Sequence, residues 1–179
     1  MPVKFSPTLV ILTWCLTATP LPIQAEDVRR GMDSLLTPFK AIQPYIASQE
    51  LFTESNNRAR VLSIIQDLQK NFHRLESVPS SYHQLPGFDD NLLAVTDLLD
   101  DAGRRLSEDK ASYAWWRIRK LPSDCVTCHA TYKVSNQFSN EAVVDGSLDP
   151  LNRARFLLAT RQFRAAQDQF LRVLQEPSF

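Results

Sequence analysis

The sequence contains little cysteine and little glycine, and beyond its first 25 residues it has no long apolar run. Only three of the 179 residues are cysteine, too few for the disulfide framework of a small secreted domain. Four glycines, with no long stretch of alternating β-branched residues, argue against a β fold. The formal net charge is zero and no polybasic stretch occurs, so nothing indicates binding to nucleic acid or to lipid headgroups.

The first 25 residues have the pattern of a secretory signal peptide. Lys4 supplies the positive charge, residues 8–18 form an apolar core, and Ala25 is a small residue at which cleavage is expected. This apolar run is too short for a transmembrane helix, and no later stretch is long and apolar enough to cross a bilayer. We therefore predict a signal peptide over residues 1–25, export to the periplasm, and no membrane span after cleavage.

Four successive segments carry apolar residues at alternating steps of four and three. This spacing is typical of helices that pack side by side with a slight left-handed twist, so it predicts an all-α fold with a packed helical bundle. Prolines 38, 44 and 122 predict kinks or breaks, and Pro122 followed by Ser123 predicts that the fourth segment is two helices end to end, with Ser123 as the cap. The apolar stripes are Val28, Met32, Leu35, Phe39, Ile42 and Ile46; Val61, Ile65, Leu68, Phe72 and Leu75; Phe88, Leu92, Val95, Leu99, Ala102 and Leu106; and Ala111, Trp115, Ile118, Cys125, His129 and Tyr132.

The C-terminal part of the chain has a different pattern. Residues 135–148 are small and polar and are predicted to be a linker, and Asp149-Pro150 then marks a helix start. Residues 149–179 resemble one helical hairpin of the tetratricopeptide type. Because a single repeat cannot bury both of its faces, this hairpin should pack on the bundle, meet a second copy, or belong to a longer array.

The motif Cys125-Val126-Thr127-Cys128-His129 indicates attachment of haem c. On a helix the two cysteines share one face and can each form a thioether with a haem vinyl group, while His129 ligates the iron. A zinc half-site would need two more ligands, and the third cysteine, Cys15, lies in the predicted signal peptide. We therefore predict one covalent haem c held by Cys125, Cys128 and His129, which agrees with export.

The motif is followed by an aromatic residue, Tyr132, and a basic residue, Lys133, and it lies near the end of the four-segment pattern. With these features the chain resembles the class II cytochromes c, the cytochrome c′ family. The resemblance covers residues 26–134. It implies an antiparallel four-helix bundle with haem packed between the helices, often as a homodimer. It also implies a distal side that is either vacant and open to nitric oxide or carbon monoxide, or closed by a methionine from the first helix.

A sixth iron ligand must come from upstream, because neither Met nor His follows His129. The candidates are Met32, His73 and His83. Met32 lies on the apolar stripe of the first segment, where the resemblance would bring a distal residue, although a plain core role fits it equally. His73 has polar helical neighbours and His83 lies in a proline-rich connector, so both are expected to be solvated.

The identity of this ligand separates two functions. Met32 on the iron predicts a low-spin electron carrier that exchanges electrons with a redox partner protein. Leu35 or Leu36 over the iron predicts a five-coordinate site that binds nitric oxide or carbon monoxide. A haem enzyme such as a peroxidase would need a distal acid–base pair, which the sequence does not indicate, so we predict no enzymatic activity. Arg117, Arg119 and Lys120 gather positive charge that could pair with propionates, guide an acidic partner, or simply be solvated.

Overall fold

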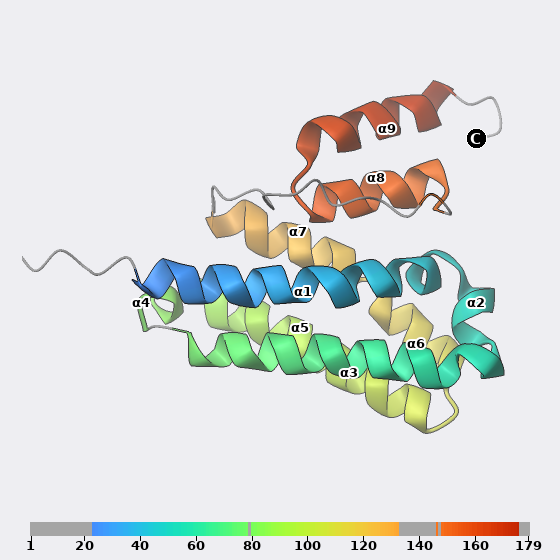
Figure 1. Cartoon of the computed structure of the whole chain (residues 1–179), viewed down its shortest axis with the longest axis horizontal. Helices are drawn as coiled ribbons and strands as arrows, with labels where there is room; N and C mark the ends of the chain where they lie inside the picture. The colour runs from blue at the N-terminus through green and yellow to red at the C-terminus, as the bar shows by residue number, and fades with distance from the viewer. Residues whose placement is uncertain (1–22, 79, 133–145, 147, 176–179) are drawn as a thin grey trace, which may run out of the picture.

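The computed structural model describes residues 23–78, 80–132, 146 and 148–175, and within these ranges all regular structure is helical, with no strand (Figure 1). The predicted all-α class is therefore confirmed. The predicted signal peptide lies outside the described residues except for residues 23–25, and the predicted linker except for residues 146 and 148. In the described part of the chain, no helix combines the length and the apolar character needed to cross a membrane.

Three long helices form the main core. They are α1 (Ile23–Ala47), α3 (Arg58–Arg74) and α5 (Phe88–Ser107); α1 packs against α3, and α3 packs against α5 (Figure 1). The predicted stripes face this contact: Ile42, Leu68 and Leu99 each have a relative exposure of 0%. Burying an aliphatic side chain of this size contributes about 1.5–3 kcal/mol, so the stripes hold the three helices together.

Proline acts differently in the first and fourth segments. Kinks or breaks were predicted at Pro38 and Pro44; helix α1 continues through both residues, so no break occurs there. Phe39 and Ile42 between these prolines are buried in the core, and their packing offsets the missing backbone hydrogen bonds. The fourth segment does divide, as predicted, into α6 (Ala111–Ile118) and α7 (Leu121–Tyr132).

The start of α7 differs from the prediction in one respect. Ser123 is not a cap, because α7 begins at Leu121 and already includes Pro122 in its first turn. The Lys120 carbonyl accepts hydrogen bonds from the backbone N–H groups of Ser123, at 2.9 Å, and Asp124, at 3.2 Å. Proline fits this position since the first N–H groups of a helix have no partner within the helix.

Short helical pieces connect these helices. They are α2 (Gln49–Thr53), the 3₁₀ turns η1 (Ser55–Asn57) and η2 (Leu75–Ser77), and α4 (Ser80–His83). Asn57 precedes α3 without a side-chain capping bond. Gly87 starts α5 with φ of 74°, a left-handed conformation that glycine adopts without steric cost.

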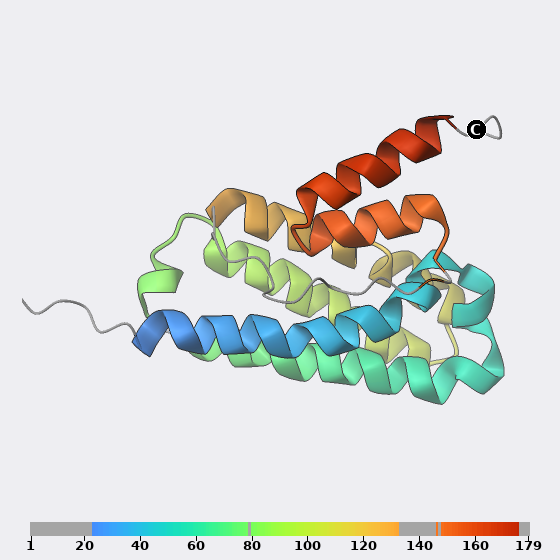
Figure 2. The ribbon, with the colours of Figure 1, turned by 45° about the horizontal axis from the view of Figure 1, so that its top comes forward.

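The C-terminal hairpin packs onto the rest of the protein. It consists of α8 (Pro150–Ala159) and α9 (Phe163–Gln175), and α8 contacts both α7 and α1 (Figure 2). Phe156 of α8 is only 1% exposed, and its ring stacks on Phe39 of α1 with centroids 5.5 Å apart and planes 15° apart. Of the three arrangements expected for the hairpin, the structure has the first.

Helix α8 begins at a side-chain cap that can be tested. The Asp149 carboxylate accepts a hydrogen bond from the Asn152 N–H at 3.0 Å. Burial alone would raise the pKa of Asp149, but the hydrogen bonds from Asn152 outweigh it and lower the pKa. We expect Asp149→Ala to cost about 1 kcal/mol of stability at pH 7. Urea denaturation followed by circular dichroism would measure this loss.

The pH dependence of the same cap has a definite sign. A carboxyl with a lowered pKa in the folded state adds stability above its unfolded pKa of about 3.9, and this stability is lost as the pH falls through the folded value. The difference between wild type and Asp149→Ala should therefore shrink below about pH 4. Asp168→Ala, on the exposed side of α9, is the control and should change stability little. An equal loss in both variants would contradict the capping role.

Candidate functional site

A narrow apolar slot lies between α1, α3, α5, α7 and the end of α8. The volume free of protein atoms in and around the slot, including its opening to solvent, is about 700 Å³. Of this volume, only about 60 Å³ can hold the centre of a water molecule. Apolar side chains of the first three segments form most of its walls: Met32, Leu35, Leu36, Phe39, Leu68, Phe72, Leu75, Phe88, Leu92 and Val95. Such a slot suits a flat, apolar group better than a polar substrate.

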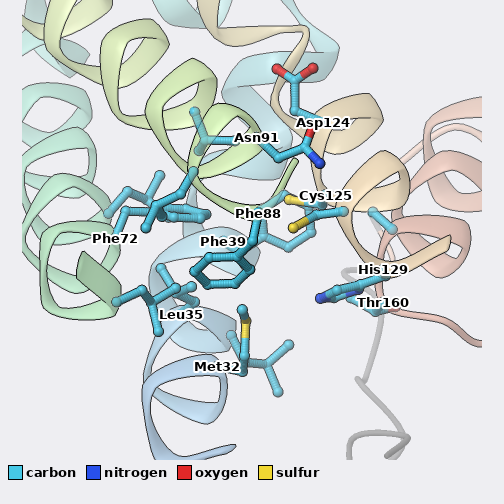
Figure 3. A pocket seen from close by; sticks show the side chains of 17 residues that line it. Met32, Leu35, Phe39, Phe72, Phe88, Asn91, Asp124, Cys125, His129 and Thr160 are labelled. Atoms are coloured by element: carbon cyan, nitrogen blue, oxygen red, sulfur yellow. The ribbon is translucent and has the colours of Figure 1, made fainter. Parts of the chain in front are cut away.

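Helix α7 places the whole sequence motif at this slot. Cys125, Cys128 and His129 line it together with Met32 of α1, so all four predicted site residues come together in one place. The cysteines share a face because residues three apart on a helix are neighbours. Figure 3 shows His129 and Met32 reaching into the slot from these two different helices.

The two thiols are free and lie in protein surroundings that keep them protonated. Burial, together with the charge of Asp124 and the neighbouring Cys128, raises the pKa of Cys125 to about 12. Burial also raises the pKa of Cys128. Thiol–disulfide exchange proceeds through a thiolate, which these surroundings disfavour. Within the described residues, no three side chains of His, Cys, Asp or Glu gather as a metal-ion site.

The imidazole of His129 is held in its neutral form. Burial lowers the pKa of His129, and the positive charge of Arg161 lowers it further. The backbone of Ala159 raises this pKa, but by less, so the net shift is downward. Nδ1 is buried and has no hydrogen-bond partner among the described residues. Leaving such a buried nitrogen unpaired costs about 1–3 kcal/mol, so the ring is suited to a partner that the protein itself does not supply.

The part of the slot wall that α1 forms includes every residue predicted for the distal side of a haem. Met32, Leu35 and Leu36 of α1 all line it. Met32 and Leu36 are half-buried, whereas Leu35 is 7% exposed. Met32, predicted for electron transfer, and Leu35 and Leu36, predicted for gas binding, thus lie close together on one helix. Which of these two functions the protein has stays a prediction.

The other two histidines lie away from the slot walls. His73 Nδ1 is 2.8 Å from Glu76 Oε1, and its side chain is 46% exposed, as expected for a solvated residue. His83 pairs with Asp89 at 2.5 Å and meets the Phe88 ring edge-on. In each case the hydrogen bond to the carboxylate is the main cause of a raised pKa.

Sequence reasoning missed the contribution of the C-terminal hairpin to this site. Ala159 and Thr160 at the end of α8 line the slot beside His129. Their short side chains carry no chemical motif, so only the docking of α8 reveals their role. Sequence reasoning did not single out Phe156 either, and its contact with Phe39 could not be inferred from spacing.

Comparison with known proteins adds no family to this picture. No protein-family model, no curated protein sequence and no solved structure matches this chain. The resemblance to the class II cytochromes c therefore rests on the CxxCH motif, its place in the chain and the helix pattern, and it is carried forward as a proposal.

Proposed function

We propose that this protein is a periplasmic c-type cytochrome that carries one covalent haem c in the slot and transfers electrons. The observation that supports this most directly is the position of Cys125, Cys128 and His129 on the face of α7 that lines an apolar slot. In this proposal α1, α3, α5 and the α6–α7 pair form an antiparallel four-helix bundle around the haem, and the hairpin is an addition to that bundle.

Each residue of the site has a defined part in the proposal. The two thiols would each add across a vinyl double bond, with sulfur going to one carbon and hydrogen to the other. His129 would bind the iron from the α7 side through its neutral imidazole. Phe39, Phe72 and Phe88 would exclude water from the slot. The bound haem would supply an iron that changes its charge by one electron, and a redox partner protein would exchange that electron.

The attachment can be tested by producing the chain in a host that has a cytochrome maturation system. We expect coloured protein whose mass exceeds that of the polypeptide by one haem, and a pyridine haemochrome spectrum of the haem c type. Cys125→Ser with Cys128→Ser should remove all covalent haem. Cys15→Ser changes the remaining cysteine of the chain, which lies in the predicted signal peptide. This control variant should keep the covalent haem. Colourless wild-type protein would overturn the proposal.

A gas-binding function is the second candidate. It is favoured by the apolar side chains of Leu35 and Leu36 beside Met32, since an iron covered by an alkyl group has room for a small neutral gas but offers it no hydrogen bond. A homodimer is compatible with either function.

Substituting Met32 separates the two candidates. If Met32 is the sixth ligand, the ferrous protein should be low-spin and unchanged by carbon monoxide, and Met32→Ala should make it high-spin and able to bind the gas. Leu36→Ala, a change of similar size in the same wall, is the control and should leave the spin state unaltered. Absorption spectra with and without carbon monoxide measure this. A wild-type protein that is already high-spin and binds the gas would favour gas binding instead.

A further inference from the structure

We propose that a second cleft, on the other face of α7, binds a small organic acid. The cleft lies where the end of α1 meets α6, the start of α7, and α8, and about 510 Å³ of it is wide enough for water. This volume falls within the range of about 300–1,000 Å³ that is usual for small-molecule sites. Its existence does not depend on haem attachment.

Helix α7 separates this cleft from the slot. Cys125, Cys128 and His129 line the slot, whereas Pro122, Ser123 and Val126 line the cleft. Val126 lies four residues after Pro122 and three residues after Ser123, and these spacings make it a neighbour of both on the helix surface. The two cavities therefore use different surfaces of the same helix.

The charges that line the cleft are all positive. Arg119, Lys120 and Arg155 contribute to its walls, and no Asp or Glu does. None of the three forms an ion pair of 4.0 Å or less with another described residue, although the charge of Lys120 acts on Asp124, one helical turn further along the chain. The Arg119 guanidinium instead lies over the Trp115 ring, 5.2 Å from its centroid. An anion would complement these groups.

An unsatisfied buried donor points to the same kind of ligand. Gln43 of α1 is only 4% exposed, it lines the cleft, and its Nε2 has no hydrogen-bond partner among the described residues. A buried amide N–H₂ without an acceptor is costly, and most such groups in folded proteins are paired. An acceptor that reached this N–H₂ group, such as the oxygen of a carboxylate, would satisfy it.

The remaining walls favour an organic acid over a bare inorganic anion. Ile46, Trp115 and Leu158 present apolar surface to the cleft. The Trp115 Nε1–H is already bonded to the Ile46 carbonyl at 3.1 Å, so the indole is fixed in place and offers only its ring to a ligand. A carboxylate with an apolar body would therefore find partners of both kinds in the cleft, the cations and Gln43 for its oxygens and this surface for its body.

Isothermal titration of the purified full-length protein with benzoate tests the proposal, with inorganic phosphate and a hexaglutamate peptide as comparison probes. We expect saturable binding of benzoate and weaker binding of the other two. Arg155→Gln should weaken benzoate binding at least about tenfold, since it removes a charge-assisted hydrogen bond. Arg164→Gln, an equal change of charge on the exposed face of α9, should leave the affinity unchanged.

Gln43→Leu provides a second, uncharged variant and should also weaken binding, by about fivefold or more for one lost hydrogen bond. Its circular dichroism spectrum would show that it folds. The absence of benzoate binding at millimolar concentration would overturn the proposal. So would equal affinity in Arg155→Gln and Arg164→Gln, or hexaglutamate binding in preference to benzoate, which would indicate an acidic protein partner. None of these outcomes depends on the haem, so they leave the proposed cytochrome function untouched.

Discussion

His129→Ala is expected, on the proposed function, to yield a protein that would keep a haem through the two thioethers but would lose the imidazole proposed to bind the iron. The visible spectrum should change completely in the position and intensity of its main bands, and added imidazole at millimolar concentration should restore much of the wild-type spectrum. The reason is that His129 is the one imidazole of the chain that lines the slot, where its ring is neutral and Nδ1 is unpaired.

His73→Ala is the matched control for this change. It also removes an imidazole, but His73 lies on the outside of α3 and pairs with Glu76 and Asp100. Its spectrum should equal that of the wild type. If His129→Ala and His73→Ala gave the same spectrum, His129 would not be the iron ligand, and the proposed arrangement of the site would be wrong even if the cysteines hold the haem.

Phe156→Ala is expected to lower the free energy of unfolding by about 3–5 kcal/mol, the usual loss when a large aromatic ring is removed from a core. Phe156 is 1% exposed and stacks on Phe39, which itself lines the slot. The change should therefore loosen the hairpin and also alter the wall of the slot. Urea denaturation measures the loss, and the haem spectrum reports the change at the wall.

Phe163→Ala is the control for this second prediction. Phe163 begins α9 and is 54% exposed, so its removal should cost less than about 1 kcal/mol. Equal effects of the two substitutions would mean that the hairpin adds little to the stability of the fold. A large effect of Phe156→Ala alone would show that α8 is an integral part of the core.

Both predictions depend on the position of α8. Phe156 docks the helix on α1, and the same helix brings Ala159 and Thr160 to the slot beside His129. The surroundings of the histidine are therefore set partly by a hairpin that lies after the motif in the chain. Loss of docking should change the environment of His129 even though no residue of the motif is altered.

The helices could be predicted because their signal is local. The apolar stripe of the third segment, from Phe88 to Leu106, coincides with the buried face of α5, and the division of the fourth segment at Pro122 follows from the missing proline N–H. The same local reasoning failed at Pro38 and Pro44, because the packing around Phe39 and Ile42 maintains the helix there. Tertiary contacts override a local conformational preference when the free energy gained by burial exceeds the free energy of that preference.

The grouping of the three motif residues was likewise determined by the sequence alone, since two cysteines and a histidine at this spacing must share one face of a helix. Only the tertiary structure decided what that face meets: Met32, Leu35 and Leu36 from α1 and the end of α8, all lining one slot. It also decided that an adjoining face of α7 lines a cleft together with Gln43 of α1 and Arg155 of α8. Spacing along a chain specifies which residues are neighbours on one helix, whereas contacts between helices depend on how whole surfaces pack, which no local pattern contains.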